Sequence, residues 1–363
     1  MRRNNIRKTE ALIMAFALSA SLLLTGCGNS TGSKNTASNN ASIVSSSNSV
    51  DNNNGSGDNK NTNGDSVNGN SSTTDEAGVN HDYPVMLFSY DKNDTNYEEP
   101  EAFNSEHLGG NYGEIEKIEY YSTTTNATRN ANVYLPYGYD KSKSYPVVYL
   151  LHGMSGTYED YRVLGARPTA QNIVYEYNRN DMILVSFTVF TDVDGKQESD
   201  YGFSDLTARY DACENDVINA GLNYGYSIFN SHYSTKIGRE YTGIAGYSLG
   251  GREALYLCFA HPDIFGYVGA FEPVGGVVNT GSGETLYGNR GYLLPELVKE
   301  GGEAPLLTLI VTGDEDPYCR VSSENYSRYM TEHSIDHIFY YRHGGHEAGV
   351  WNNGLYNFLR RIF

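Results

Sequence analysis

The chain is poor in cysteine, with only four in 363 residues. Beyond Cys27 these are Cys213, Cys258 and Cys319, an odd number, widely spaced in a chain long enough to bury a core of its own. This usage excludes a disulfide scaffold. Cys258 lies in an apolar helical pattern and is expected to be a small buried hydrophobe rather than a reactive thiol.

Basic residues are also scarce, with 26 Lys and Arg against 44 Asp and Glu and a net charge of −18. Residues 1–26 hold four of the basic residues and one acidic residue, so the remainder of the chain carries −21. A surface this acidic repels polyanions. Nucleic acid and anionic surfaces are therefore not expected partners.

Long hydrophobic runs are missing as well. The longest apolar stretch, residues 11–24, is too short to span a bilayer, and four basic residues precede it. This pattern predicts an export signal over residues 1–26. The Leu-Thr-Gly-Cys sequence at 24–27 resembles the lipobox of bacterial lipoproteins, which implies an acylated Cys27 and a lipid anchor on the extracellular face of the cell membrane. The alternative is an ordinary secretory signal and a secreted protein.

Aromatic residues are absent from residues 28–80, which consist mainly of Asn, Ser, Gly, Thr and Asp. Such a segment buries too little apolar surface to offset the loss of chain entropy on folding. Residues 27–81 are therefore predicted to form a flexible tether. Whether the tether supplies reach through a cell wall or only tolerates sequence drift stays open. Residues 82–363 are predicted to fold as one domain.

Within that domain, short apolar runs alternate with helical patterns. The predicted strands cover residues 114–122, 131–136, 145–153, 182–189, 241–248, 306–313 and 337–344. The predicted helices cover residues 157–179, 208–230, 250–260 and 320–333. This alternation predicts an α/β fold with a mostly parallel central sheet, helices on both faces and an antiparallel edge hairpin made by the first two strands. Catalytic groups should gather at the carboxyl ends of the strands.

Gly246-Tyr247-Ser248-Leu249-Gly250 is a G-x-S-x-G motif between a predicted strand and a predicted helix. An abrupt strand-to-helix turn strains the central residue and needs neighbours without Cβ atoms. It exposes the Ser248 hydroxyl and directs the Leu249 amide to the same spot, at the positive end of the helix. The motif therefore predicts a nucleophile together with one oxyanion donor. The alternative is a glycine-rich turn with an incidental serine.

A serine hydroxyl needs a base, and histidine titrates in the useful range. Two histidines follow the last predicted strand, His343 and His346. His346 has two glycines before it and is free to lean over the sheet, so it is the predicted base. His343 lies nearer the strand and is expected to be structural.

The acid that orients the base should follow the preceding strand, and residues 306–318 end in three acidic residues. Asp316 is the predicted acid, since Gly313 makes the turn before it and a proline follows it. Asp314 and Glu315 are its rivals. With Asp316, the chain order is Ser, Asp, His, as in the α/β-hydrolase arrangement of a catalytic triad.

A second oxyanion donor is expected from the loop after an early strand, within residues 150–156. The Met154 amide is preferred over that of Gly153 because Met154 lies where the chain turns away from the strand. His152 is interpreted as a support for this loop. Two donors matter because the loss of one slows such reactions by about 10²-fold or more.

A metal site is the competing interpretation of the last histidine-rich segment, where His337, His343, His346 and Glu347 are close in sequence. No H-E-x-x-H motif occurs, and alternate residues of a strand point to opposite faces. The prediction is therefore a site without metal or cofactor.

The whole domain resembles the esterase D-like group of carbohydrate esterase family 1, including the feruloyl esterase modules of bacterial xylanases, and more distantly the mycolyltransferase antigens. The matching stretches are 113–140, 145–161, 244–251, 312–316 and 344–359. Gly-Gly-His followed by Val350, Trp351 and an aromatic helix is typical of the feruloyl esterase modules. The resemblance implies an α/β-hydrolase fold, a triad of Ser248, Asp316 and His346, and oxyanion amides at Leu249 and Met154.

The resemblance also implies a serine esterase that removes feruloyl groups from a plant cell-wall polysaccharide such as arabinoxylan, with acetyl xylan as the alternative substrate. Residues 190–210 and 275–295 depart from the family and are expected to shape the acyl pocket. The export signal argues against a cytosolic formylglutathione hydrolase. Alternatives from other classes are a surface carbohydrate-binding protein, or a general lipase or peptidase.

Overall fold

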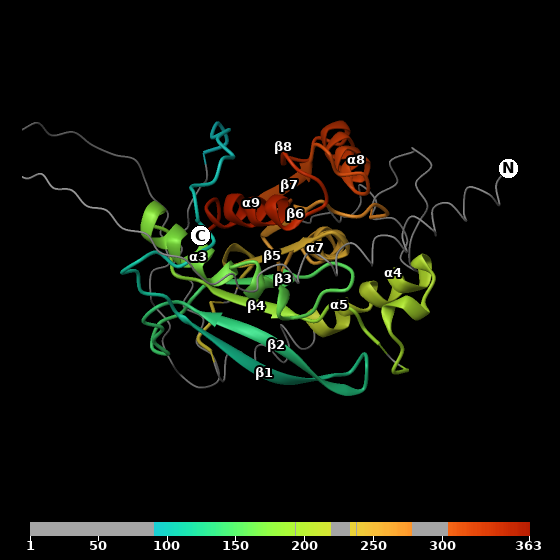
Figure 1. Ribbon diagram of the computed structural model, residues 1–363, viewed down its shortest axis with the longest axis horizontal. Coiled ribbons are helices and arrows are strands. Elements are labelled where there is room, and N and C mark those ends of the chain that lie inside the picture. Colours follow the sequence, from blue (N-terminus) through green and yellow to red (C-terminus); the bar gives the residue numbers. More distant parts are fainter. Residues whose placement is uncertain (1–90, 193, 219–232, 237, 278–303) are drawn as a thin grey trace, which may run out of the picture. The chain divides into compact units, whose positions relative to one another are not determined.

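Eight strands form one sheet in the order β1-β2-β4-β3-β5-β6-β7-β8 (Figure 1). The computed structural model describes residues 91–192, 194–218, 233–236, 238–277 and 304–363, all of which belong to one compact unit. The strands are β1 (Glu114–Ser122), β2 (Ala127–Leu135), β3 (Val147–Leu151), β4 (Ile183–Phe187), β5 (Thr242–Tyr247), β6 (Tyr267–Phe271), β7 (Leu307–Gly313) and β8 (Ile338–Arg342). β2 pairs antiparallel with both β1 and β4, whereas the remaining pairs are parallel. The α/β class and the antiparallel edge are confirmed.

The central strands are buried on both faces. In β3, Val147, Tyr149 and Leu151 belong to one hydrophobic cluster, whereas Val148 and Leu150 belong to the other. This division follows from the two-residue repeat of a strand. A strand that is covered on both sides needs apolar residues at every position, which is why β3 and β4 are continuous apolar runs.

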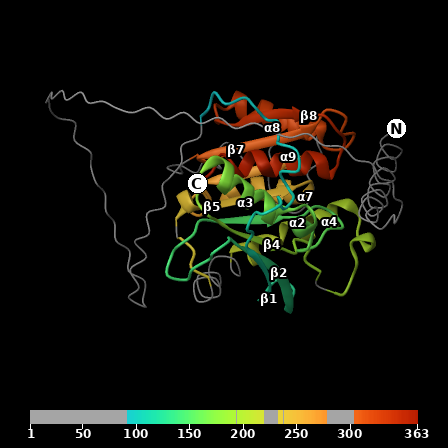
Figure 2. The ribbon, with the colours of Figure 1, turned by 60° about the vertical axis from the view of Figure 1, so that its left-hand side comes forward.

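Helices contribute residues to both hydrophobic clusters. The described helices are α2 (Asp160–Val163), α3 (Ala166–Tyr177), α4 (Phe203–Asp211), α5 (Cys213–Asn215), α7 (Leu249–Ala260), α8 (Arg320–Glu332) and α9 (Ala348–Leu359), with 3₁₀ turns η1 (Glu198–Asp200) and η3 (Arg239–Tyr241). Residues of α4, α7 and α8 lie in one cluster, and residues of α3 and α9 lie in the other. α3 and α9 also pack on each other (Figure 2). The prediction of helices on both faces is confirmed.

Two elements were not predicted from the sequence pattern. β6 is only five residues long and contains Gly269, so its period-2 signal is weak. α9 was anticipated only through the family resemblance, because its apolar residues continue almost around the helix instead of forming one stripe. β6 matters for the site because it lies between β5 and β7.

Three boundaries also differ from the predictions. The helix predicted over 157–179 is divided at Gly165, whose φ of 76° lies in the left-handed region and ends α2 before α3 begins. The helix predicted from residue 208 starts earlier, as α4 at Phe203, and residues 219–230 lie outside the described part. β2 begins at Ala127, so the edge hairpin has a tighter turn than expected.

Residues 91–113 dock on the carboxyl-terminal helix. Arg360 Nη1 donates to Asp94 Oδ2 at 2.7 Å, and Arg361 Nη2 donates to the Asn96 carbonyl at 3.2 Å. Tyr97 stacks on Tyr340 with 4.0 Å between ring centroids. The predicted signal 1–26, the tether 27–81 and Cys27 lie outside the described residues. None of the helices in the described part of the chain has the length and apolarity that a bilayer crossing requires.

Candidate active site

Ser248 lies at the abrupt turn between β5 and α7, with φ 56° and ψ −122°. A Cβ on Gly246 would lie 2.3 Å from the Gly250 carbonyl oxygen, and a Cβ on Gly250 would lie 2.2 Å from the Leu151 carbonyl oxygen. Any side chain at either glycine would therefore force the backbone apart. The Ser248 amide donates to the Phe271 carbonyl at 2.9 Å, which fixes the turn on the end of β6. The strained elbow predicted from the motif is present.

The loop after β3 lies against this elbow. A Cβ on Gly153 would come within 2.9 Å of the Ser248 Cβ, so the two backbones approach closely. Met154 is half-buried and follows directly, while Leu249 is the buried first residue of α7. Among the described residues, neither the Met154 amide nor the Leu249 amide donates a hydrogen bond. Neither amide is therefore engaged elsewhere in the described part of the chain, as an oxyanion donor requires.

His152 supports the loop, as the sequence indicated. Its Nε2 accepts from the Val189 amide at 2.8 Å, so Nδ1 carries the proton and donates to the Gly153 carbonyl at 2.7 Å. Burial lowers the pKa of His152 to about 4, which keeps the ring neutral and this tautomer in place. His152 therefore orients the loop and takes no part in proton transfer.

Residues 190–210 brace the same loop from outside. Glu198 Oε2 accepts from the Ser155 amide at 2.7 Å, and the Tyr210 hydroxyl donates to the Gly153 carbonyl at 2.9 Å. This segment, predicted to shape an acyl pocket, lies next to the elbow. Of the second predicted segment, 275–295, residues 278–295 lie outside the described part.

His346 and Asp316 are hydrogen-bonded to each other. His346 Nδ1 lies 2.9 Å from Asp316 Oδ2, and the two side chains are only 5% and 0% exposed. Asp316 Oδ1 accepts from the amides of Tyr318 and Cys319 at 2.7 and 3.0 Å. Burial opposes ionisation, but His346 and these amides outweigh it and hold the pKa of Asp316 below its ordinary value.

The rival residues form a separate, exposed pair. His343 Nδ1 lies 3.3 Å from Asp314, and both side chains are largely exposed to solvent. Asp314 Oδ1 also accepts from the Gly344 amide at 3.0 Å. Glu315 is exposed as well. The structure therefore brings Asp316 to His346 and leaves Asp314 with His343.

Sequence reasoning missed Glu272, which is fully buried beside the same histidine. Its Oε2 lies 3.4 Å from His346 Nδ1 and accepts from the Trp351 indole at 2.6 Å. Burial, followed by the charge of Asp316, raises the pKa of Glu272 to about 10. An acidic residue directly after an apolar run at 267–271 is the signal that would have revealed it, once β6 was recognised as a strand.

Asp316, Cys319 and His346 are the described residues that most resemble a metal-ligand set, with ligand atoms within 4.8 Å of one another. Asp316 and His346 already satisfy each other, and burial raises the pKa of the Cys319 thiol well above its usual range. A metal ion would have to displace that hydrogen bond and deprotonate the thiol. His337 lies elsewhere, with Nε2 2.8 Å from the Ser327 hydroxyl.

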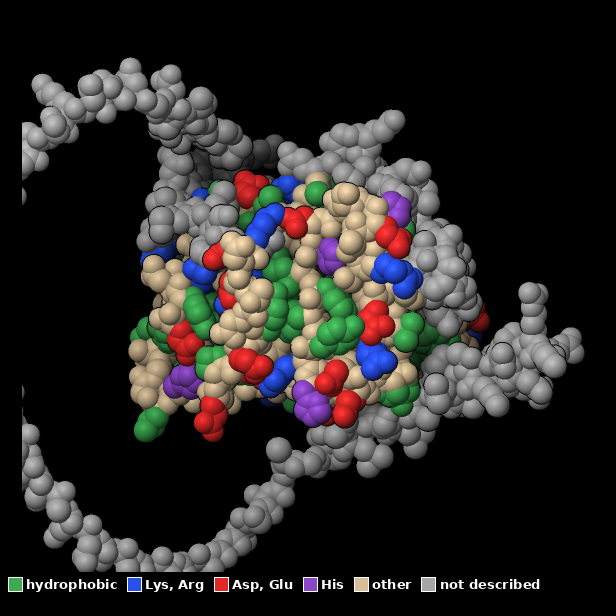
Figure 3. Space-filling view, turned by 90° about the horizontal axis from the view of Figure 1, so that it is seen from above, with side chains coloured by type: hydrophobic (Ala, Val, Ile, Leu, Met, Phe, Trp, Pro, Cys, Tyr) green, Lys and Arg blue, Asp and Glu red, His purple; other side chains and the backbone are tan. Residues whose placement is uncertain are grey.

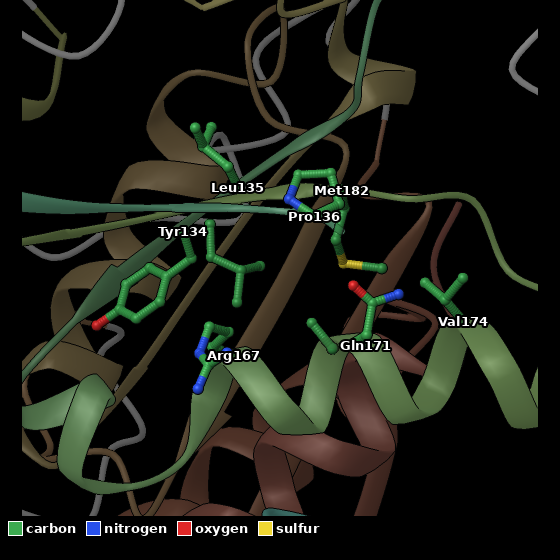
Figure 4. A pocket seen from close by; sticks show the side chains of 9 residues that line it. Tyr134, Leu135, Pro136, Arg167, Gln171, Val174 and Met182 are labelled. Atoms are coloured by element: carbon green, nitrogen blue, oxygen red, sulfur yellow. The ribbon is translucent and has the colours of Figure 1, made fainter. Parts of the chain in front are cut away.

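A small pocket lies between α3, the end of β2 and the start of β4, lined in part by Tyr134, Arg167, Gln171 and Met182 (Figure 4). Met182 directly precedes β4, so the pocket lies at the edge of the sheet opposite Ser248. Ligands of open α/β sheets bind outside the carboxyl ends of the strands. This pocket is therefore separate from the candidate site.

The surface charge is mixed on the face seen from above in Figure 1. Lys and Arg side chains lie singly among acidic ones there, and hydrophobic side chains gather between them (Figure 3). A nucleic-acid site needs a continuous basic stripe. That face of the described residues does not present one.

Comparisons with known proteins agree with this geometry. The family model "Putative esterase" matches residues 122–362. The endo-1,4-beta-xylanase/feruloyl esterase of Xylanibacter ruminicola is 28% identical over 165 residues, which are 44% of this chain and 21% of that protein. Endo-1,4-beta-xylanase Y of Acetivibrio thermocellus is 29% identical over 49% of this chain and 15% of its own length. The chain thus spans about a fifth or less of these curated relatives.

Among solved structures, a CE1 ferulic acid esterase from Anaeromyces mucronatus in complex with ferulic acid is 29% identical, with a TM-score of 0.65. The match covers 74% of this chain and 97% of that one. The feruloyl esterase module from Clostridium thermocellum, at 19% identity and a TM-score of 0.53, shares the fold. With its eight-stranded mixed sheet and a family match over most of its length, the chain belongs to the esterase family of the α/β-hydrolase fold.

Proposed function

We propose that the protein is a serine carboxylic-ester hydrolase with Ser248 as nucleophile, His346 as base and Asp316 as the acid that orients the base. The amides of Leu249 and Met154 form the oxyanion hole. The observation that carries the proposal is the buried 2.9 Å hydrogen bond between Asp316 and His346, at the sheet edge where the strained Ser248 turn lies. The family to which the chain belongs supports it.

The chemistry proceeds in two balanced steps. The Ser248 hydroxyl proton moves to His346 Nε2 while Oγ bonds to the ester carbonyl carbon, and the carbonyl oxygen becomes an oxyanion held by the two amides. The intermediate then expels the alcohol, which takes the proton from His346. Water repeats the sequence on the acyl-enzyme and releases the acid. Asp316 stays ionised throughout and stabilises the imidazolium.

The state of Ser248 fits this role. The residue is 2% exposed, and its Oγ has no hydrogen-bond partner within the described ranges. A buried hydroxyl without a partner costs free energy and needs an explanation, which the role of a nucleophile supplies for Ser248. Strained backbone at a positive φ also clusters at active sites. Both observations concern one residue, and both favour a nucleophile.

The proposed substrate is a feruloyl ester on a plant cell-wall polysaccharide such as arabinoxylan. The names of the relatives support this class of substrate, since they combine xylanase and feruloyl esterase. Tyr318 is exposed, and its ring stands edge-on to His346 with 5.9 Å between centroids. An aromatic ring beside the base offers a surface for a phenolic acyl group or a sugar.

Acetyl xylan is the second candidate substrate, because the same machinery cleaves an acetyl ester without any change. The two differ in what the acyl side must accommodate, a phenolic ring or a methyl group. Loops 190–210 and 275–295 are proposed to decide between them. No cofactor takes part in either reaction.

The first experiment compares methyl ferulate, an acetyl ester, feruloylated arabinoxylan and acetylated xylan as substrates of the full-length protein. Ferulate release well above acetate release supports the proposed acyl group. Acetate release alone moves the substrate to acetyl xylan. No turnover of any ester overturns the enzyme proposal and favours a surface carbohydrate-binding protein. Faster cleavage of long-chain esters or peptides favours the lipase or peptidase alternative.

Ser248→Ala is the matched control. We expect it to lower kcat by about 10⁶-fold, because removal of a serine nucleophile leaves only binding and oxyanion stabilisation. Polysaccharide binding should persist, since no binding group is removed. Full activity in this variant contradicts the assignment of the nucleophile.

We further propose that Cys27 is acylated and holds the enzyme on the extracellular face of the cell membrane, with residues 27–81 as a tether. A polymer that cannot enter the cell must be cleaved outside it. Cys27→Ala is expected to release the protein from the membrane fraction into the medium with its esterase activity intact. Retention of that variant on the membrane contradicts the anchor and leaves the catalytic proposal untouched.

A further inference from the structure

Glu272 occupies the residue position directly after β6, between the strands that end at Ser248 and near Asp316. Its φ of 51° lies in the left-handed region, which is costly for a residue with a side chain. Its side chain is fully buried. A buried carboxyl group on strained backbone at the carboxyl edge of the sheet requires a reason.

The contacts of Glu272 show that the carboxyl group is held in place. Oε1 accepts from the Gly313 amide at 2.9 Å, and a Cβ on Gly313 would lie only 2.8 Å from that oxygen. Oε2 accepts from the Trp351 indole at 2.6 Å. The same indole stacks on Tyr247, next to the nucleophile, with 4.1 Å between centroids. Glu272 therefore links the ends of β6 and β7 to α9 and to the elbow.

Two carboxyl groups thus face one imidazole nitrogen. His346 Nδ1 lies 2.9 Å from Asp316 Oδ2 and 3.4 Å from Glu272 Oε2. Within the described ranges, neither carboxyl group forms an ion pair with Lys or Arg. The buried Cys319 thiol also faces them. Like charges this close cannot both be ionised in a buried site, so one proton must stay on the pair.

The proton belongs on Glu272. Asp316 accepts two amides and the imidazole, all of which favour its charged form. Burial and the charge of Asp316 raise the pKa of Glu272 to about 10. The neutral acid adds no second negative charge under His346, so a single carboxylate balances the imidazolium that forms in catalysis.

We propose that Glu272 is a second acid for His346: a protonated positioning residue while Asp316 is present, and the carboxylate acceptor for Nδ1–H when Asp316 is removed. In the second state the repulsion from Asp316 has gone and His346 Nδ1–H donates to Glu272, so Glu272 gives its proton to water although burial still opposes its ionisation. The kinetic consequence rests on the proposed esterase function. The hydrogen bond between His346 and Glu272 in the absence of Asp316 does not depend on that function.

The kinetic test uses Asp316→Ala, Glu272→Gln and the double variant with methyl ferulate. We expect kcat to fall about 10²-fold in Asp316→Ala, because Glu272 takes over, and about threefold in Glu272→Gln, whose amide stays neutral. The double variant should lose about 10⁴-fold, the loss typical of a triad without its acid, with KM changed less than about threefold. This loss exceeds the product of the single losses, which a merely structural residue would not produce. Equal kcat in Asp316→Ala and the double variant overturns the proposal.

A second measurement needs no substrate and separates this proposal from the esterase function. The Nδ1–H proton of a histidine bonded to a carboxylate gives a strongly downfield proton resonance in histidine-labelled protein. We expect that resonance in the wild type and in Asp316→Ala, and its loss in the double variant. Loss already in Asp316→Ala, with thermal unfolding showing that the variant is folded, overturns the second acid even if the protein hydrolyses esters.

Discussion

Two groups of buried carboxylates lie near the nucleophile turn, and they are neutralised in different ways. In the first group, Arg252 Nη1 bonds both Asp211 and Glu253, and the guanidinium is 1% exposed. In the second group, the imidazole of His346 is the basic side chain that the described residues place against Glu272 and Asp316. The first group holds a permanent cation, and the second holds a titratable one.

This difference separates a structural charge cluster from a chemical one. Burial opposes the charge on Arg252, but Glu253 and Asp211 raise the pKa of the guanidinium, so its charge is constant at every relevant pH. The cluster connects α4 to α7 and cannot release a proton. In the second group the imidazole takes up a proton and gives it back during the proposed reaction, while Asp316 stays ionised and Glu272 stays neutral. A site that transfers protons requires the second arrangement.

Removal of the permanent cation should have the largest effect on stability. Arg252→Met is expected to lower the free energy of unfolding by about 3–5 kcal/mol, because two buried carboxylates lose their counter-charge. Urea unfolding measures this. Arg320→Met, which breaks the exposed ion pair with Glu324, is the matched control and should cost less than about 1 kcal/mol. Equal losses in the two variants would remove the distinction between the clusters.

The cluster of Glu272, Asp316 and His346 should make the free energy of unfolding depend on pH. In the unfolded chain Glu272 ionises near its ordinary pKa of 4.5, whereas the folded protein keeps the proton up to a pKa of about 10. The folded state therefore binds one more proton between these values, and its stability decreases as pH rises. Between about pH 6 and pH 8, we expect the free energy of unfolding of the wild type to fall by about 3 kcal/mol relative to Glu272→Gln.

The control for that pH effect is the variant itself. The amide introduced by Glu272→Gln cannot ionise, so the stability of this variant should lack the contribution across the same range. The Arg252 cluster is present in both proteins and cancels. Parallel stability curves for the two proteins would mean that Glu272 is ionised in the folded state, and the contrast between the clusters would fail.

The smallest expected effect belongs to the exposed acid that the sequence left as a rival. Asp314→Ala should change kcat by less than about twofold and leave the midpoint of thermal unfolding nearly unchanged, because its contacts with His343 and the Gly344 amide are open to solvent. Methyl ferulate hydrolysis and thermal unfolding test both expectations. A loss of activity as large as that expected on removal of a triad residue would give Asp314 the role proposed for Asp316.

Much of the fold was predictable because its signals are local. Seven of the eight strands were expected within a few residues of their positions, since β-branched apolar runs such as 147–151 have no other stable environment than a covered sheet. β6 was missed because five residues with a central glycine give no clear period. That omission concealed Glu272, whose meaning depends on the strand that ends at its position.

The sequence by itself determined the elbow. The two glycines around Ser248 leave room for the turn, and the strand before it and the helix after it are encoded in the adjoining residues. The sequence also placed three acids and two histidines on neighbouring loops. It could not decide how they pair, since one residue of shift along a loop reverses the direction of a side chain.

Only the tertiary structure decided the pairing. β7 and β8 pair in a register that places Gly313 opposite Arg342, and the Asp314 amide then donates to the Arg342 carbonyl at 3.0 Å. That register directs Asp314 outward to His343 and leaves Asp316 facing inward to His346. The proximity of Glu272 to the same imidazole depends on three strands far apart in the chain, and such long-range contacts have no signature in a local pattern.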